Sequence, residues 1–382
     1  MLPALAAKPS ASASASLSSK LSARPSAKSA KSAKTAESLQ ANGRSAKQTQ
    51  PALLYADRPD AMQAADDIAA RRDLDPEQVR RTIGQARLLP QITRWVLPPA
   101  KGSAKNWNAY RSRFVEPVRI KAGVAFWDAN AALLERAQRE YGVPPEIIVG
   151  ILGVETLYGR DTGNFRVIDA LATLSFDFPN EHPRARERRE FFLRELEQFL
   201  SLAQRSGKDP LTYRGSYAGA MGTPQFMPSS WTKYAIDFDG DGQIDLSGSN
   251  ADVIGSVAHY FKEFGWQTGM PTHYAVHFEP ARLDLDALLA PDILPTFGVA
   301  SFAAKGALLD DAAVQHIGPL ALVELQNGNA PPTYVAGTEN FYVITRYNWS
   351  SYYAMAVIEL GQAIAEARQV RSDVGAKASS GS

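Results

Sequence analysis

An apolar run at the centre of the chain dominates its pattern of hydrophobic and polar positions. The stretch from Ile147 to Val154 includes no polar side chain, so a helix made from it has no face suited to water. Pro144 and Pro145 suit a first helical turn, and Gly159 suits a left-handed residue at a helix end. The pattern therefore predicts a helix of about four turns that is buried on every side.

The rest of the pattern is mainly helical, with some short stretches of strand character. We predict a helix that begins at Asp75-Pro76-Glu77, a polar loop over 180–189, and further helices over 124–137, 191–200, 252–266 and 352–360. The stretches 273–278 and 341–347 alternate apolar and polar residues, which is typical of strands. Short elements and prolines follow the first of these as far as about Gly337, which indicates a small module with β-structure. The predicted fold class is mainly α, with an α+β component.

Glu155 falls near the C-terminal end of the predicted central helix. Apolar neighbours and the negative end of the helix dipole both disfavour a charged carboxylate, so both raise its pKa. A carboxyl that stays protonated at neutral pH can act as the general acid of glycoside cleavage. The alternative is a structural ion pair with Arg160 or Arg166, and spacing alone gives the two interpretations about equal weight.

The segment from Asp237 to Asp245, DFDGDGQID, has the spacing of an EF-hand calcium loop. Asp237, Asp239 and Asp241 occupy loop positions 1, 3 and 5, and Gln243 stands where such loops offer a backbone carbonyl. Position 12, which is normally a bidentate Glu, is Gly248. The alternative is an Asp- and Gly-rich turn in solvent, which fits the spacing less well.

Several sequence motifs around Glu155 resemble those of a known family. They are GVETLYGR at 153–160, DALATL at 169–174, GAMGTPQFMPSSW at 219–231 and FYVITRYN at 341–348. Together and in this order, from about Ala61 to about Ala367, they resemble the B-type lytic murein transglycosylases, which include membrane-bound and soluble forms.

The resemblance implies a lysozyme-like catalytic core over 136–265 that includes the EF-hand-like loop. A helical domain over 51–135, completed by 340–370, would surround this core, and the small β-containing module would cover 266–339. We expect the two ends of the chain, 1–50 and 371–382, to be disordered.

The resemblance also implies cleavage of the β-1,4 bond between N-acetylmuramic acid and N-acetylglucosamine in peptidoglycan. Glu155 would act as single acid and base, with help from the substrate's 2-acetamido group, and the product would carry a 1,6-anhydromuramoyl end. A retaining glycosidase would need a second carboxyl about 5 Å away, for which Asp161 and Asp169 are the near candidates in sequence. Two alternatives are a peptidoglycan hydrolase that uses water and a non-catalytic, calcium-stabilised wall-binding protein.

Family positions implied to bind substrate fall on one set of residues: Tyr110, Arg188, Ser216, Gln225, Tyr260, Tyr347, Asn348 and Tyr353. Ser216 corresponds to a serine that hydrogen-bonds the catalytic acid, and Gln225 to a glutamine that contacts the sugar. Simpler interpretations are core packing for Tyr110, a solvated basic cluster for Arg188 and a turn cap for Gln225. The resemblance also places Asp252 as the last ligand of a structural calcium ion.

The composition excludes several other kinds of chemistry. The 382 residues include no Cys, so disulfides and thiolate metal sites are impossible, and no spacing of His or Gly residues indicates a catalytic metal or an organic cofactor. Outside residues 1–50, which hold eight Lys/Arg and one acid, 33 basic residues face 39 acidic ones (41 − 8 and 40 − 1). A mildly acidic folded part argues against nucleic-acid binding.

The Ala-, Ser- and Lys-rich residues 1–50 contain little apolar bulk. We interpret them as a solubilising leader rather than a cationic tether to the envelope. They show no signal-peptide pattern, the chain has no 18-residue apolar span, and no Cys is present for a lipid anchor. The resemblance nevertheless implies a periplasmic or envelope location, peptidoglycan strands as the partner and a monomeric protein.

Overall fold

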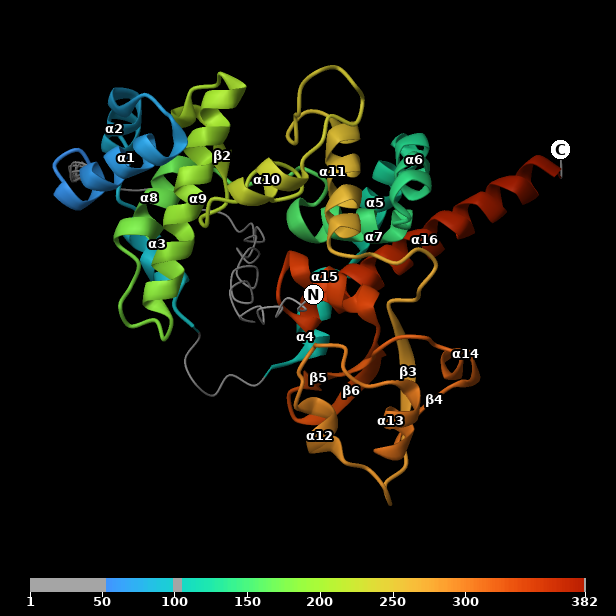
Figure 1. Ribbon diagram of the computed structural model, residues 1–382. Helices are drawn as coiled ribbons and strands as arrows, with labels where there is room; N and C mark the ends of the chain where they lie inside the picture. The colour runs from blue at the N-terminus through green and yellow to red at the C-terminus, as the bar shows by residue number, and fades with distance from the viewer. Residues whose placement is uncertain (1–52, 99–104, 381–382) are drawn as a thin grey trace, which may run out of the picture.

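The computed structural model describes residues 53–98 and 105–380, and most of its elements are helices (Figure 1). The fold class expected from the sequence, mainly α with a small β component, is confirmed. Buried side chains form three clusters, one in each lobe of the ribbon. No helix in the described part of the chain combines the length and apolar character needed to cross a bilayer.

The first lobe joins two distant stretches of sequence. Three N-terminal helices, α1 (Pro59–Arg72), α2 (Pro76–Gly84) and α3 (Pro90–Trp95), pack with α8 (Val167–Phe176) and α9 (Ala185–Ser206). Asp75 caps α2 by accepting hydrogen bonds from two backbone amides, as its sequence predicted. Helix α9 begins inside the predicted 180–189 loop. A two-stranded pair, β1 (Phe165–Arg166) and β2 (Arg214–Gly215), and the 3-10 turn η1 (Pro210–Thr212) complete this lobe.

The central lobe is built around helix α7 (Pro145–Thr156), whose residues from Ile147 to Val154 are all buried, as the apolar run predicted. Helix α16 (Ser351–Ser380) crosses it so closely that a Cβ on Gly150 would lie 2.3 Å from the Val357 carbonyl oxygen. The same lobe holds α4 (Trp107–Arg111), α5 (Pro117–Ala129), α6 (Ala131–Tyr141), α10 (Pro228–Tyr234), α11 (Asn250–Glu263) and α15 (Glu339–Tyr347).

The third lobe is a four-stranded antiparallel sheet in the order β4-β3-β6-β5. Its strands are β3 (His273–Phe278), β4 (Ala307–Leu309), β5 (Ala321–Asn327) and β6 (Ala330–Gly337), joined by α12 (Leu285–Leu289), α13 (Val299–Ala304) and α14 (Asp311–Val314). The predicted strand at 273–278 is confirmed. Strand β5 serves two cores, because Val323 and Leu325 pack into the central lobe while Leu322 packs into the module.

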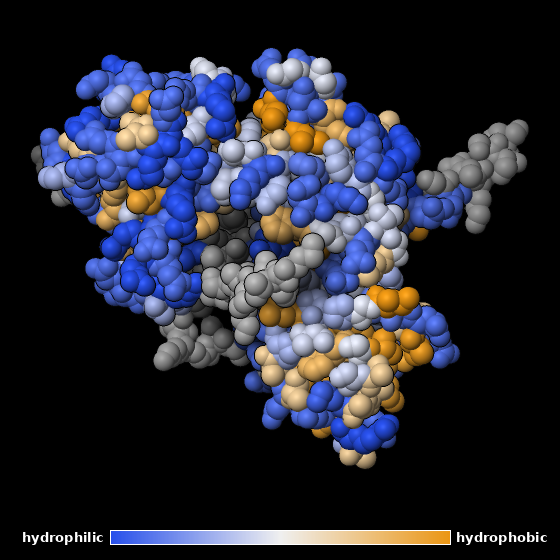
Figure 2. Space-filling view, viewed as in Figure 1, coloured by the Kyte–Doolittle hydropathy of each residue, from blue (hydrophilic) through white to orange (hydrophobic). Residues whose placement is uncertain are grey.

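The surface differs between the lobes. Hydrophilic side chains cover most of the first lobe in the space-filling view, whereas apolar side chains gather on the β module (Figure 2). The module's exposed apolar residues include Leu308, Val314 and Ile317, of which Ile317 is 90% exposed. The β module is therefore the more apolar part of this face.

Several sequence predictions differ from the structure. The helix predicted over 124–137 is two helices, because the chain breaks at Asn130. The alternating stretch 341–347 is helix α15, because the Thr338 side chain caps its first turn and tertiary packing overrides the alternation. Residues 371–380, expected to be disordered, continue α16, since adding residues to an established helix costs little. The expected tail at 1–50 lies outside the described residues.

The buried clusters also group the chain differently from the predicted domains. Residues from 167 to 221, which fall in the expected core over 136–265, share their buried cluster with the N-terminal helices. The rest of that range shares its cluster with α4, α5, α15 and α16. Two segments of the predicted catalytic core therefore lie in different lobes, and the chain crosses from one lobe to the other where these segments join.

Candidate active site

Glu155 lies in the last turn of α7, where the chain leaves the helix abruptly. Leu157 and Tyr158 adopt left-handed backbone angles (φ 50° and 58°), and Gly159 follows with φ 83°. Gly159 is left-handed as predicted, but the helix has already ended at Thr156. Two non-glycine residues in this region each cost about 1–2 kcal/mol, so the surrounding structure must hold the turn in place.

Thr156 ties this turn to the segment 216–231, which we call the substrate loop. Its hydroxyl donates a hydrogen bond to the Thr223 carbonyl at 2.8 Å and accepts one from the Gly159 amide at 2.9 Å. Thr156 is 1% exposed, so both bonds are shielded from water. The residue next to Glu155 therefore fixes the helix end against the loop.

The Glu155 side chain lines a cavity of about 280 Å³ between the first and central lobes. The cavity, which we call the catalytic cavity, includes five of the eight predicted substrate-binding residues: Ser216, Gln225, Tyr260, Tyr347 and Asn348. Tyr353 lies directly behind Glu155 and is fully buried. Tyr110 and Arg188 do not line this cavity.

Burial and one hydrogen bond set the acidity of Glu155. Burial raises the pKa of Glu155 from its ordinary 4.5 to about 7, and a hydrogen bond from Tyr353 partly opposes the rise. The Tyr353 hydroxyl donates this bond to Glu155 Oε1 at 2.5 Å. A carboxyl with this pKa is present in both protonation states at neutral pH, so it can both give and take a proton.

Tyr260 and Tyr347 form an aromatic wall of the cavity, with ring centroids 4.9 Å apart. Their hydroxyls are already committed: Tyr260 donates to the Arg346 carbonyl at 2.7 Å, and Tyr347 to the Pro224 carbonyl at 2.5 Å. They therefore offer ring faces rather than hydroxyls to a ligand, which suits the apolar face of a sugar. Beside them, Asn348 Oδ1 is buried and accepts no hydrogen bond from the described residues.

Two residues of the substrate loop that we predicted to bind substrate are hydrogen-bonded to backbone groups. The Ser216 hydroxyl accepts hydrogen bonds from the amides of Ala218 and Ala220. Among the described residues, Tyr353 rather than Ser216 bonds Glu155, so the predicted serine contact is replaced by one from α16. Gln225 has a left-handed backbone, and its side-chain amide donates to the carbonyls of Thr162 and Gly222.

Tyr110 and Arg188 lie one layer away from the cavity. Tyr110 packs against the rings of Trp107, Phe114 and Tyr352, and its pKa is raised first by burial and then by the charge of Glu155. Arg188 is 4% exposed and lies over the rings of Phe191 and Phe192, so it is not part of a solvated cluster. Both side chains therefore support the walls of the cavity.

The structure adds a second carboxyl that the sequence analysis did not single out. Glu195 on α9 lines the cavity and is 3% exposed. Its Oε1 accepts from the Ser229 hydroxyl at 2.6 Å and its Oε2 from the Ser229 amide at 2.9 Å, and burial raises its pKa. The available signal was an acid on the apolar side of an amphipathic helix, a position where a charged residue requires partners.

The two carboxyls that the sequence offered as partners for Glu155 lie elsewhere. Asp169 is buried and bonded to the Arg166 guanidinium and to the Arg87 amide, so it is a structural ion pair. Asp161 is exposed and does not line the catalytic cavity.

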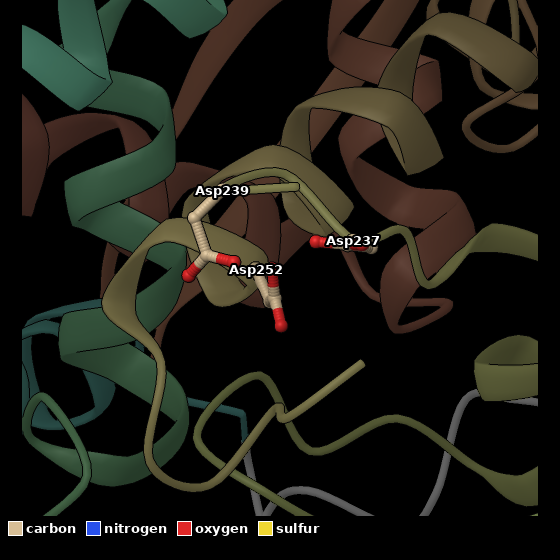
Figure 3. A group of neighbouring side chains, drawn as sticks. All are labelled: Asp237, Asp239 and Asp252. Atoms are coloured by element: carbon tan, nitrogen blue, oxygen red, sulfur yellow. The ribbon is translucent and has the colours of Figure 1, made fainter. Parts of the chain in front are cut away.

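The EF-hand-like segment brings three carboxylates together. Oxygen atoms of Asp237, Asp239 and Asp252 lie within 4.8 Å of one another (Figure 3). Asp252 is 1% exposed, and its oxygens accept hydrogen bonds from the amides of Phe238 and Asp245, both at 2.8 Å. Burial and then the charges of Asp239 and Asp237 raise its pKa. Clustered carboxylate oxygens fixed by backbone amides fit a hard divalent cation.

One predicted carboxylate ligand of that cation is not in the cluster. Asp241 is outside the group of three, and its Oδ1 accepts a hydrogen bond from the Gln243 amide at 2.8 Å. Asp252, in contrast, reaches the cluster from helix α11 despite its distance from the loop in sequence. The carboxylates that already lie together for a metal are therefore those of Asp237, Asp239 and Asp252.

Comparisons with known proteins agree on one family. The transglycosylase SLT domain family matches residues 57–362. Membrane-bound lytic murein transglycosylase B of Escherichia coli K12 is 41% identical over 323 residues, which cover 82% of this chain and 85% of that protein. The solved structure of the E. coli lytic transglycosylase Slt35 in complex with calcium has a TM-score of 0.70 and 40% identity, and the match covers 82% of this chain and 95% of that one.

A further solved relative carries a sugar ligand. SltB3 from Pseudomonas aeruginosa, in complex with NAG-anhNAM-pentapeptide, matches with a TM-score of 0.63 and 27% identity over 79% of this chain and 78% of that one.

Proposed function

The chain belongs to the transglycosylase SLT domain family and is a peptidoglycan lytic transglycosylase, and we propose that Glu155 alone performs its acid and base chemistry. The bond cleaved is the β-1,4 link between N-acetylmuramic acid and N-acetylglucosamine. The product carries a 1,6-anhydromuramoyl end. The observation that carries this proposal is the Glu155 carboxyl in the catalytic cavity, hydrogen-bonded to Tyr353 and with a pKa of about 7.

The reaction needs two proton transfers, and Glu155 takes part in both. Protonated Glu155 gives its proton to the glycosidic oxygen, and the bond from that oxygen to the muramoyl C1 breaks. The 2-acetamido group of the substrate stabilises the positive charge that develops at C1. The Glu155 carboxylate then takes the proton of the muramoyl 6-hydroxyl while that oxygen bonds to C1, which restores the acid and closes the anhydro ring.

The hydrogen bonds of Glu195 support the proposal that only one carboxyl is catalytic. A retaining or inverting glycosidase needs a second carboxylate that is free to attack C1 or to activate water. Both oxygens of Glu195 are occupied by Ser229, and burial disfavours its charged form. The anhydro-sugar ligand named for SltB3 also supports this product type within the family.

The substrate-binding residues follow from the lining of the cavity. We assign the sugar rings to the faces of Tyr260 and Tyr347, and an amide N–H or hydroxyl of the substrate to the free Asn348 Oδ1. Ser216 and Gln225 shape the loop side of the cavity. Tyr110, Arg188 and Tyr353 act behind the surface by holding its walls and Glu155.

Calcium is the cation we assign to Asp237, Asp239 and Asp252. The proposal rests on the converging carboxylates, and the calcium complex of Slt35 supports it. When bound, the ion would neutralise the cluster and fix the loop to α11, which is a structural task. The Asp241 side chain and the Gln243 carbonyl complete the ligand set we propose.

The chemistry of the substrate sets the location that we propose. Peptidoglycan lies in the cell envelope, so the enzyme acts in the periplasm, as a monomer on glycan strands. The name of the E. coli relative, which is membrane-bound, supports an envelope location.

Product analysis tests the function directly. Purified peptidoglycan is digested with the wild-type chain and with Glu155→Gln, and the soluble fragments are analysed by mass spectrometry. We expect anhydromuramoyl ends from the wild type and none from the variant. Reducing ends would instead identify a hydrolase that uses water, and equal release by both proteins would remove Glu155 from the mechanism.

A further inference from the structure

A second cavity adjoins the substrate loop and is not used by the proposed chemistry. Its volume is about 720 Å³, compared with about 280 Å³ for the catalytic cavity. The substrate loop contributes to both: Ser216 and Gln225 line the catalytic cavity, while Met221 and Gly222 line the second one. The C-terminal end of α9 and the calcium-loop segment 242–247 supply further parts of its wall.

Cations dominate the charged side chains of this second cavity, which we call the basic cavity. Arg205, Lys208 and Arg214 line it, whereas Asp245 is its single acidic lining residue, which leaves an excess of two positive charges (3 − 1). No salt bridge joins any of the three cations to a carboxylate among the described residues. Arg214 is instead held by backbone carbonyls, including that of Leu211 at 3.0 Å. An anion could therefore approach all three without displacing an existing ion pair.

The remaining lining is partly apolar. The rings of Trp231 and Tyr213 lie in the wall, and Ile244, which is 40% exposed, belongs to the calcium-loop side. A volume of this order suits a compact ligand such as a short peptide. The combination of cations with apolar surface favours a ligand that carries several carboxylates together with apolar side chains, which is the chemistry of an acidic peptide.

We propose that the basic cavity binds the acidic stem peptide of peptidoglycan, with peptide carboxylates on Arg205, Lys208 and Arg214 and an apolar side chain against Trp231. This inference rests on the proposed function, because it takes peptidoglycan as the substrate. Nucleic acid is a poor alternative, since the chain outside residues 1–50 carries more acidic than basic residues.

One set of contacts connects the basic cavity to the catalytic cavity. Thr162 lines the basic cavity, and its carbonyl accepts a hydrogen bond from the Gln225 side chain at 3.1 Å. Gln225 also donates to the carbonyl of Gly222, another lining residue of the basic cavity, at 2.9 Å. A peptide in the basic cavity would therefore contact the backbone that positions Gln225 against the sugar.

Calorimetry with the free stem tetrapeptide, released from peptidoglycan by an amidase, tests the proposal. The titrated protein is the full chain with Glu155→Gln, which prevents turnover. We expect saturable binding that weakens with salt, and about a tenfold weaker affinity when Lys208→Gln and Arg214→Gln are added. The same peptide with amidated carboxyls should bind as weakly to the parent protein as the acidic peptide does to this variant.

A matched control removes the same charge elsewhere. Lys121→Gln with Arg139→Gln takes two exposed cations from α5 and α6, neither of which lines the catalytic or the basic cavity, and should leave the affinity for the peptide unchanged. Equal melting temperatures would show that both double variants fold.

Three results would overturn the inference: no binding of the peptide, equal loss of binding in both double variants, or binding that resists the Lys208 and Arg214 substitutions but is lost with Asn348→Ala. The last result would place the peptide in the catalytic cavity. Digestion of peptidoglycan by the wild type is the separate readout for the proposed function, so the two failures are distinguishable.

Discussion

Glu155 and Glu195 are two carboxyls in one cavity, the first half-buried and the second buried, and they differ in the hydrogen-bond partners of their oxygens. Burial raises the pKa of both. Glu195 uses its two oxygens on the amide and hydroxyl of Ser229, which fixes the start of α10 against α9. Glu155 receives one side-chain hydrogen bond, from Tyr353. Burial therefore creates the unusual acidity, and the remaining hydrogen-bonding capacity decides which carboxyl can react.

The largest effect should come from removing the acid at Glu155. Glu155→Gln keeps the shape and can still accept the Tyr353 hydrogen bond, but it cannot transfer a proton. We expect peptidoglycan cleavage to fall by about 10²–10⁴-fold with little change in melting temperature. The measurement is the rate of soluble muropeptide release. A loss below tenfold would show that Glu155 is not the essential acid.

The calcium loop offers a third group of carboxyls, in which a cation would provide the compensation. If Asp237, Asp239 and Asp252 hold calcium, saturating ion at about 100 times its dissociation constant should stabilise the fold by about 2.7 kcal/mol. EDTA should therefore lower the melting temperature, and added calcium should restore it. An unchanged melting temperature, after metal analysis proves removal of the ion, would contradict the assignment.

Glu195→Gln should act mainly on stability. The amide nitrogen of Gln would face one of the two Ser229 donors, so a buried donor would lose its acceptor. We expect a loss of about 1–3 kcal/mol in the free energy of unfolding, measured by urea denaturation, and a smaller loss of activity than in Glu155→Gln. Glu190→Gln, an exposed position on the same helix, is the matched control and should change stability by less than about 0.5 kcal/mol.

The pH dependence should distinguish Glu155 from a carboxyl of ordinary acidity. The first step requires its protonated form, so the rate of cleavage should fall as pH rises above the pKa of about 7, approaching tenfold per pH unit. The contribution of Glu155 to folding stability changes with pH in the same direction as the rate. A carboxyl whose folded pKa is raised above 4.5 contributes stability below pH 4.5 that is lost as pH rises through about 7. A rate that rises between pH 7 and 8 would oppose this assignment.

Tyr353→Phe should produce the smallest change. The Tyr353 hydrogen bond lowers the pKa of Glu155, so its removal should raise that pKa and move the falling limb of the pH–rate profile to higher pH. We expect a few-fold change in rate at pH 7, since one hydrogen bond contributes about 1 kcal/mol. Tyr352→Phe, a neighbouring tyrosine whose hydroxyl bonds Gln326, is the control and should leave the profile unchanged.

Local signals in the sequence were enough for some of this site and insufficient for the rest. The apolar run and the Asp75 cap depend on neighbouring residues, so the buried helix α7 and the start of α2 were predictable. The bond from Tyr353 to Glu155 joins residues 198 positions apart, and no periodicity reports such a contact. Family resemblance brought both residues to the site but assigned the bond to Ser216.

Glu195 and α15 show two other limits. A carboxyl on the buried side of α9 has the same sequence pattern whether it is catalytic or structural, and only its bonds to Ser229 distinguish the cases. The sequence of α15 alternates as a strand does, but the Thr338 cap and packing against α16 make it a helix. Tertiary contacts therefore decided the points on which local pattern was ambiguous.

The crossing of α7 and α16 gives the proton donor an unusual dependence on remote backbone atoms. At Gly150 and Gly361 the backbone carbonyl of one helix contacts the Cα of the other. A methyl group on Gly361 would lie 2.1 Å from the backbone carbonyl oxygen of Glu146. The distance from the Tyr353 hydroxyl to the Glu155 carboxyl is consequently set by contact between the two helix backbones. Repacking of side chains cannot adjust it. One carbon atom added at either glycine, in contact with neither the sugar nor Glu155, would therefore be enough to alter the proton donor and impair catalysis.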